Sequence, residues 1–104
     1  MERKNQTIYI CGQVTGLPVE ETRQKFEAAA EYCRAVLGFK TAINPMNICS
    51  PVMAWPEAMK RCIGNLMMCH AIYMLPDWTK SRGATLERFI ATNLSIEIIE
   101  GAAL

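Results

Sequence analysis

Three residues near one predicted helix start have the types and spacing to do chemistry: Ser81, Gly83 and Glu87. Serine is a favoured N-cap, and a helix start offers free N–H groups and a positive dipole to an anion. Gly83 costs a helix about 1 kcal/mol relative to alanine, which is easier to accept where something must approach the backbone closely. Glu87 follows four residues later on the same helical face. The pattern predicts a ligand-binding helix start with one carboxylate beside it.

Simpler interpretations of these residues stay open. Most charged side chains are solvated, so from spacing alone Glu87 is more often an ordinary surface glutamate. Trp78, in the loop before this helix, could stack on a flat ligand ring or could anchor its loop to the core.

The elements that must position these residues alternate along the chain. The run 71–75 is apolar on both sides, which is typical of a central strand of a parallel sheet. The segment 94–99 alternates Ser95 and Glu97 with Ile96 and Ile98, which predicts an edge strand with one solvent-exposed face. The remaining elements are expected as strands at 7–11 and 39–43, helices at 18–37, from 55 and from 81, and a connecting loop at 46–54.

This order predicts an α/β fold: a small doubly wound, Rossmann- or flavodoxin-like parallel sheet of about four strands with three main helices. The first strand is commonly central, so the loops 12–16 and 76–80 should meet at the carboxyl edge of the sheet. Tyr9 and Gly12 would then lie near the Ser81 helix. Neither a GxGxxG fingerprint nor a Walker A loop is present, so NAD and kinase chemistry have no support.

Composition limits the possible functions. The chain has 104 residues, which suits a single domain at 1–104, and its 51% hydrophobic content indicates a globular protein. A net charge of +1 gives no argument for a nucleic acid polymer as partner. No run is long enough to span a bilayer and no signal segment is recognised, so we expect a cytoplasmic protein with no membrane partner. Five cysteines without a CxxC pair and a single histidine predict reduced thiols, no metal site and no cofactor.

Two blocks of the sequence carry a family resemblance. Residues 9–17 (YICGQVTGL) resemble the YISGxMTGL opening of a family of short bacterial and phage proteins of unknown function. Residues 69–87 (CHAIYMLPDWTKSRGATLE) resemble that family's CDAIYxLPGWxxSxGAxxE block. Those proteins are similar to nucleoside 2-deoxyribosyltransferases and to deoxynucleoside 5'-monophosphate N-hydrolases, and the resemblance covers almost the whole chain in element order.

The resemblance implies roles for individual residues. Glu87 occupies the position of the glutamate that attacks the anomeric carbon, and Tyr9 matches a tyrosine that contacts it. Ser81 and Gly83 match residues that bind the sugar 5' end or its phosphate, and Gly12 would complete that cradle. A carboxylate beside an oxocarbenium-like centre is chemically reasonable, as in retaining glycosidases.

The chain departs from the enzymes at three positions. Cys62 stands where they carry an aspartate that helps the departing base, and His70 stands at the aspartate that begins their third strand. Thr15 stands where the N-hydrolases have a phosphate-binding arginine, and we expect it, with Asp77 and Trp78, among the substrate-binding residues. General acid catalysis is typically worth about 10²–10⁴-fold, so its loss matters, and Asp77 is the candidate substitute.

We therefore expect an enzyme that cleaves or transfers an N-glycosidic bond of a nucleoside or nucleotide, with Glu87 as nucleophile. The alternatives are a catalytically impaired nucleotide-binding module, favoured by Cys62, and a pure assembly protein with a methionine-rich interface. A homodimer is expected in each case, because a sheet of this length buries little surface alone.

Overall fold

A four-stranded parallel sheet forms the centre of the computed structural model, which describes residues 3–101. Its strands are β1 (Thr7–Cys11), β2 (Thr41–Ile43), β3 (Ala71–Met74) and β4 (Glu97–Glu100), in the order β2-β1-β3-β4. The two interior strands are those with the most apolar sequences, and Ile8 to Cys11 and Ala71 to Met74 are fully buried or nearly so. The predicted fold class and the central place of the first strand are confirmed.

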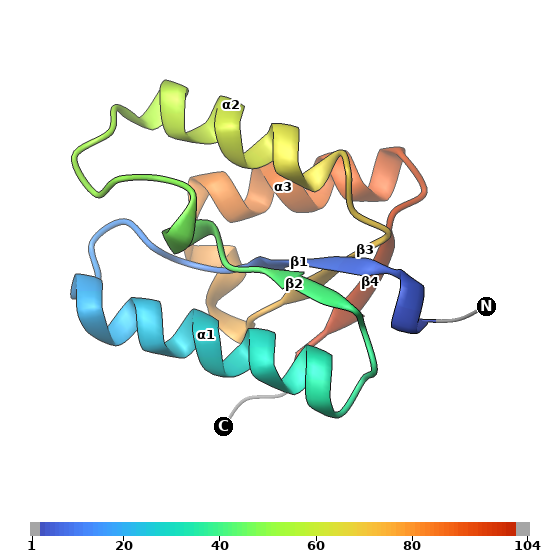
Figure 1. The fold of residues 1–104 in the computed structure, drawn as a ribbon. Helices are drawn as coiled ribbons and strands as arrows, with labels where there is room; N and C mark the ends of the chain where they lie inside the picture. The colour runs from blue at the N-terminus through green and yellow to red at the C-terminus, as the bar shows by residue number, and fades with distance from the viewer. Residues whose placement is uncertain (1–2, 102–104) are drawn as a thin grey trace.

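Helices cover both faces of the sheet (Figure 1). Helix α1 (Val19–Ala35) lies on one face, whereas α2 (Trp55–Leu66) and α3 (Arg82–Asn93) lie side by side on the other. Among the described residues, short 3₁₀ turns precede β1 (η1, Arg3–Asn5), follow β2 (η2, Pro45–Asn47) and join β3 to α3 (η3, Pro76–Lys80). This is the arrangement that right-handed crossovers between parallel strands produce.

Alternation along β1 divides the core into two halves. Ile8 and Ile10 point to the α1 side and pack with Phe26 and its neighbours. Tyr9 and Cys11 point to the other side, where α2 and α3 pack. Since successive strand residues face opposite sides, the side chains of Tyr9 and Cys11 face α2 and α3.

The end of the chain differs from the prediction. The predicted strand 94–99 is β4 at Glu97–Glu100, because α3 continues to Asn93 and Ser95 then takes a left-handed conformation with φ of 59°. Strand β4 is an edge strand, as predicted. The prediction of one wet face is wrong, because Ile98 packs into one half of the core and Ile99 into the other.

The register of the sheet brings two loops together. Cys11 lies opposite Met74, so β1 and β3 end at the same level, and the Leu75 N–H donates to the Cys11 carbonyl at 2.8 Å. The loop after β1 and the η3 turn therefore share one edge, as predicted. Within residues 3–101, every helix is too short or too polar to cross a bilayer.

Candidate active site

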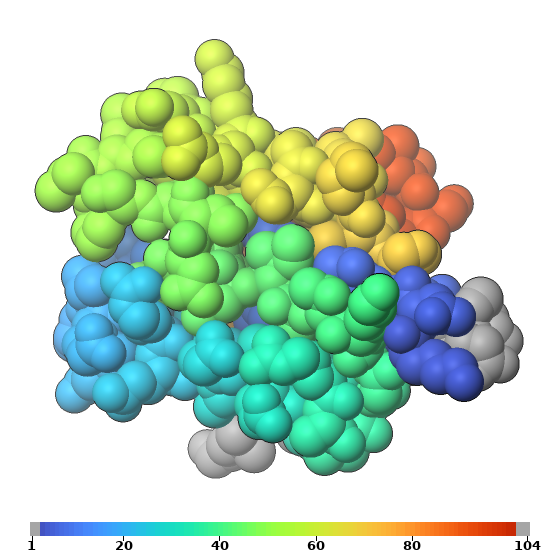
Figure 2. Space-filling model, viewed as in Figure 1, coloured from blue at the N-terminus to red at the C-terminus, as the bar shows by residue number. Residues whose placement is uncertain are grey.

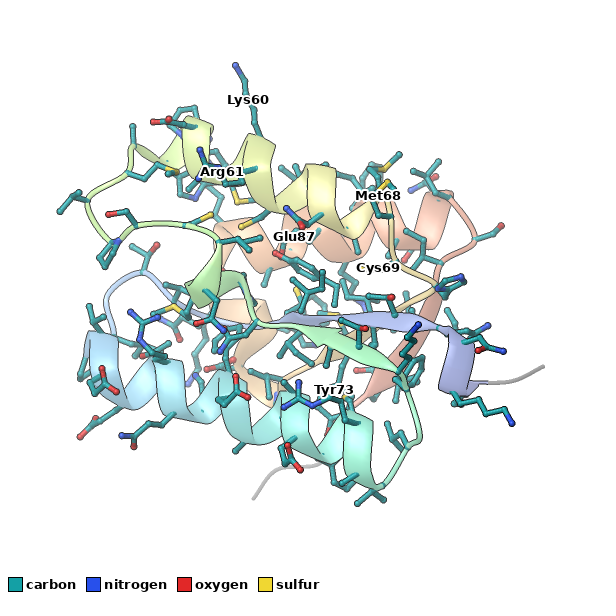
Figure 3. All side chains as sticks on the ribbon, viewed as in Figure 1. Lys60, Arg61, Met68, Cys69, Tyr73 and Glu87 are labelled. Atoms are coloured by element: carbon teal, nitrogen blue, oxygen red, sulfur yellow. The ribbon has the colours of Figure 1, made fainter. Side chains whose placement is uncertain are left out.

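Glu87 is a buried carboxylate between the helix layer and the sheet (Figure 3). It lies on α3 in a stripe with Gly83, Ala84 and Ala91, all of them buried, and only 6% of Glu87 is exposed. The small residues of this stripe let α3 approach the sheet closely, so the longer Glu87 side chain lies under the helix. The interpretation of Glu87 as a surface glutamate is wrong.

Both oxygens of Glu87 accept hydrogen bonds from β1. The Tyr9 hydroxyl donates to Oε2 at 2.8 Å, and the Cys11 thiol donates to Oε1 at 3.3 Å. Tyr9 is the residue that sequence reasoning paired with Glu87. Cys11 was missed, although its place two residues after Tyr9 puts it on the same face of the strand.

Burial controls the protonation of this group. Removal from water raises the pKa of Glu87 to about 7, even though the hydrogen bonds from Tyr9 and Cys11 favour the ionised form. Burial likewise raises the pKa of Tyr9 well above its ordinary value, and the nearby Glu87 charge adds to this. Tyr9 therefore stays protonated and available as a donor, whereas Glu87 changes charge near neutral pH.

A pocket of about 420 Å³ opens beside Glu87. Its volume lies within the usual range for small-molecule sites, roughly 300–1,000 Å³. Six of the eight residues predicted for the site line this pocket: Tyr9, Gly12, Thr15, Ser81, Gly83 and Glu87. The sequence thus predicted most of one wall, formed by β1, its following loop and the start of α3.

The opposite wall was missed, because the segment 46–54 was interpreted only as a connection. Met46, Cys49 and Met53 line the pocket from this segment, and Trp55 and Met59 do so from α2. In Figure 2 the green residues of η2 and the start of this segment lie on the surface between the blue residues of α1 and the yellow-green residues of α2.

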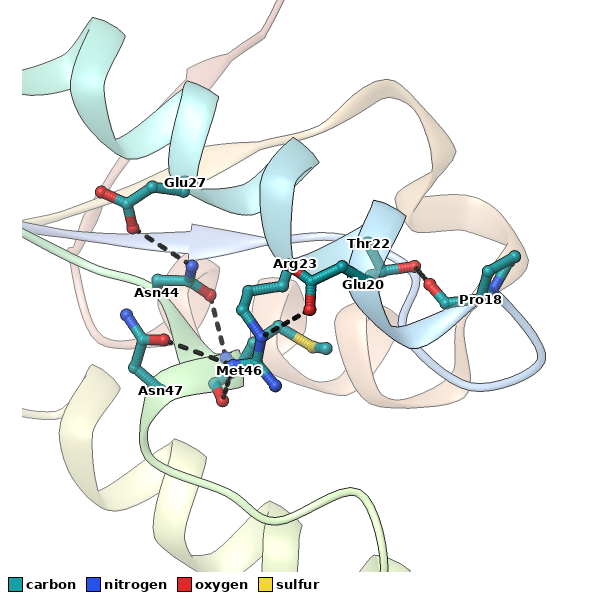
Figure 4. Close-up of polar contacts among 8 residues, drawn as sticks. All are labelled: Pro18, Glu20, Thr22, Arg23, Glu27, Asn44, Met46 and Asn47. Atoms are coloured by element: carbon teal, nitrogen blue, oxygen red, sulfur yellow. Dashed lines mark hydrogen bonds and ion pairs between the residues drawn. The ribbon is translucent and has the colours of Figure 1, made fainter.

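Helix α1 holds the beginning of this wall in place (Figure 4). Asn44 is buried, and its side-chain oxygen caps η2 by accepting from the Met46 N–H at 2.9 Å. Arg23 donates to the Met46 carbonyl at 3.0 Å, and Asn44 donates to Glu27 at 3.4 Å. Since asparagine is a common cap, the Asn44-Pro45 pair is a sequence signal for this turn.

Ser81 and Gly83 lie at the start of α3, as predicted, and each also stabilises the fold. Ser81 caps α3 by accepting from the Ala84 N–H at 3.1 Å. A Cβ at position 83 would lie 2.9 Å from Met59 Sδ, so the close approach at Gly83 includes packing of α2. Gly12 is tighter still, because a Cβ there would lie 2.8 Å from Leu75 Cδ1 and 2.9 Å from Leu75 Cβ.

Asp77 and Trp78 do not belong to the pocket lining. Asp77 accepts from the Gln13 N–H at 3.1 Å and pairs with Lys25 at 2.6 Å. Partial burial favours its neutral form, but the bonds from Lys25 and Gln13 outweigh this and hold the pKa of Asp77 below its ordinary value. Asp77 therefore favours its charged form and lies outside the pocket lining, which gives no support to its predicted role as a substitute acid.

Trp78 anchors its loop to the core, which is one of the two roles that the sequence left open. It packs against the half of the core that contains Tyr9, and the Arg88 guanidinium lies 4.5 Å from its ring centroid. Its ring is thus engaged by protein groups and anchors η3.

Cys62 lines the pocket from α2, where its thiol lies close enough to Tyr9 to add to the rise that burial causes in the pKa of that hydroxyl. Burial raises the pKa of its thiol to about 12. Glu87 is the one charged side chain among the described residues that line the pocket. In the same part of the chain, no three His, Cys, Asp or Glu residues form a cluster that could hold a metal ion.

A family model described as "Domain of unknown function (DUF4406)" matches residues 6–100. No curated protein and no solved structure matches the chain.

Proposed function

The chain belongs to the family described as domain of unknown function DUF4406, and we propose that it cleaves the N-glycosidic bond of a nucleoside. The observation that carries the proposal is the Glu87 carboxylate, buried at a pocket wall with a donor on each oxygen. Its geometry agrees with the roles that resemblance to deoxyribosyltransferases and N-hydrolases implies for Glu87 and Tyr9.

The chemistry requires the ionised form of Glu87. One carboxylate oxygen attacks the anomeric carbon, the bond from that carbon to the base nitrogen breaks, and its electron pair leaves with the base. Water or a second base then displaces the carboxylate from the sugar. Tyr9 and Cys11 hold Glu87 in one orientation, so that little freedom is lost in reaching the attacking geometry.

The departing base receives little help from the protein. Cys62 stands where the resemblance implies an aspartate, and its thiol is a very weak acid with a pKa of about 12. A leaving nitrogen without a positioned acid forgoes about 10²–10⁴-fold in rate. We therefore propose a slow enzyme, fastest with bases that leave as stable anions or that are protonated by solvent.

The lining of the pocket favours an uncharged substrate. Apart from Glu87, the described lining residues are apolar or neutral, including Val14, Leu17 and Met53. A 5'-phosphate would meet the helix start at Ser81 and backbone N–H groups without a lysine or arginine among those lining residues. A 2'-deoxynucleoside is the preferred substrate in this account, and its monophosphate the weaker one.

Release of free base tests the proposal. The protein is incubated with the four 2'-deoxynucleosides and, separately, with their monophosphates, and free base is measured by liquid chromatography. We expect base release from at least one deoxynucleoside and none with Glu87→Ala. No base release from any of these compounds, or an equal rate with Glu87→Ala, would overturn the catalytic proposal.

A binding module without turnover is the second candidate, and Cys62 is the observation that favours it. It predicts that a nucleoside or nucleotide raises the melting temperature, as any ligand of the native state does, while no base is released. Failure of all eight compounds to shift the melting temperature would remove this candidate.

We also propose that the chain forms a homodimer. Large apolar side chains are exposed on α3 and in the turn after α2, and Met68 of that turn points outward in Figure 3. The exposed fractions are 79% for Met68, 66% for Phe89 and 52% for Met67. Light scattering that reports a monomer at micromolar concentration would contradict this.

A further inference from the structure

Two cysteines meet at the wall of the pocket. Cys49 Sγ, in the segment after η2, lies 3.3 Å from Cys62 Sγ on α2. Both residues line the pocket, and Cys49 is half-buried whereas Cys62 is buried. From this geometry we propose that Cys49 and Cys62 form a reversible disulfide when the protein meets a low-molecular-weight disulfide, which makes the pocket wall a thiol modification site.

The geometry suits bond formation. A disulfide requires an S–S distance of about 2 Å, so the two sulfurs need to close only the small gap beyond their present contact. Cys49 lies in the connecting segment before α2, and its thiol already contacts that helix, donating to the Ala58 carbonyl at 3.6 Å. The thiols of Cys11 and Cys69 are engaged elsewhere, with Glu87 and the Asn65 carbonyl respectively.

The order of the two steps follows from burial. Cys49 lines the pocket and is the more accessible, so its thiolate attacks the incoming disulfide, forms a mixed disulfide and expels one thiolate. Cys62 loses its proton to solvent, attacks Cys49 Sγ and expels the second thiolate. The protein gives up two electrons and two protons, and the small disulfide becomes two thiols. The high pKa of Cys62, about 12, makes its attack the slower step.

The modification would act on the site itself. The new bond joins the 48–54 segment to α2 across one wall, and Cys62 is the residue that lies beside Tyr9. This inference does not depend on the proposed catalysis, because it concerns the reactivity of the thiols alone.

Oxidised glutathione is the probe, because it spares the seven methionines that a peroxide would attack. The folded protein is incubated with it, quenched with acid, denatured and alkylated, and its intact mass is measured before and after reduction. We expect the loss of two hydrogen atoms and three alkylated thiols in place of the five of the reduced chain. Reduction with dithiothreitol should restore all five.

Peptide mapping without reduction separates Cys49 from Cys62, since Lys60 and Arg61 provide trypsin sites between them, and fragmentation of the linked peptide distinguishes Cys62 from Cys69, which share one tryptic peptide. A linked peptide containing Cys49 and Cys62 supports the proposal. Five alkylatable thiols after exposure, a different cysteine pair, or glutathione adducts without an internal bond would each overturn it.

Variants separate the two roles. Cys62→Ser should stop at a stable glutathione adduct on Cys49, and Cys49→Ser should show neither the bond nor rapid adduct formation. Cys33→Ala, in the half of the core that faces α1, is the matched control and should form the bond as the wild type does. Loss of the bond in Cys33→Ala with its melting temperature retained, or its persistence in Cys49→Ser, would contradict the assignment.

Discussion

The Tyr9 hydroxyl donates to Glu87 Oε2 at 2.8 Å, joining the first strand to the last helix across 78 positions of sequence. The two residues are far apart in sequence, so no local element brings them together. The bond exists because β1 and α3 face each other on the side of the sheet that α2 and α3 cover, where small residues bring α3 close.

Replacing Tyr9 with phenylalanine tests this bond. Tyr9→Phe keeps the ring and removes the donor from Oε2, so the ionised form of Glu87 loses support. We expect a loss of about 1 kcal/mol in the free energy of unfolding, measured in urea at pH 8, and a Glu87 pKa higher than in the wild type. Tyr32→Phe, at an exposed tyrosine, should change neither quantity; an unchanged stability in Tyr9→Phe would show that the bond contributes nothing.

The stability of the protein should fall as pH rises towards neutral. The folded pKa of Glu87, about 7, exceeds the ordinary value of 4.5. The folded state therefore binds this proton more tightly than the unfolded chain, and stability from Glu87 is full below about pH 4.5 and is lost as pH rises to about 7. The shift corresponds to on the order of 3 kcal/mol.

The matched measurement compares the wild type with Glu87→Gln, which cannot ionise. The difference in unfolding free energy between the two should move in favour of Glu87→Gln from pH 5 to pH 8. Glu57→Gln, at an exposed glutamate in the first turn of α2, should track the wild type. A wild-type minus Glu87→Gln difference that stays constant with pH would contradict the raised pKa.

The same titration predicts the pH profile of base release. Attack on the anomeric carbon needs the carboxylate, so kcat/KM should rise with pH through an apparent pKa near 7. A rate that only falls across that range would instead identify Glu87 as a proton donor. The profile is measured from pH 5 to pH 9 with one deoxynucleoside at low concentration.

Two glycines give a prediction about packing. Gly12→Ala would place a Cβ 2.8 Å from Leu75 Cδ1 and 2.9 Å from Leu75 Cβ, where the loop after β1 crosses the end of β3. Overpacking of this kind costs about 1–3 kcal/mol, so the melting temperature should fall. Gly64→Ala, in α2 with no atom within 4 Å of the added Cβ, should instead stabilise the protein by about 1 kcal/mol. Equal melting temperatures of the two variants would be inconsistent with the described packing.

Periodicity and local chemistry were sufficient to predict the sheet, its three helices and the wall of the site formed by Tyr9, Gly12, Ser81 and Glu87. These residues lie on elements whose apolar patterns are strong, so their relative places follow from parallel-sheet topology. Burial of Glu87 could not be derived from spacing, because it depends on how closely α3 approaches the sheet.

The other wall of the pocket depends on a segment without periodicity. The beginning of this segment is held by Arg23 of α1, which donates to the Met46 carbonyl (Figure 4). Asn44 caps the same turn and is a local signal for it, but no local signal indicates the contact from α1. Asp77 shows a similar limit: its spacing allowed an acid role, but Lys25 is 52 positions away in sequence and becomes its partner only in the fold.

A covalent sugar adduct on Glu87 is the most direct test of the central claim. The protein is mixed with the deoxynucleoside that releases base fastest, quenched in acid within the first turnover, digested and analysed by mass spectrometry. The account predicts a deoxyribosyl group on the peptide that contains Glu87, and no adduct with Glu87→Gln. Base release by the wild type without an adduct on that peptide in any quenched sample, and with activity retained in Glu87→Gln, would contradict it.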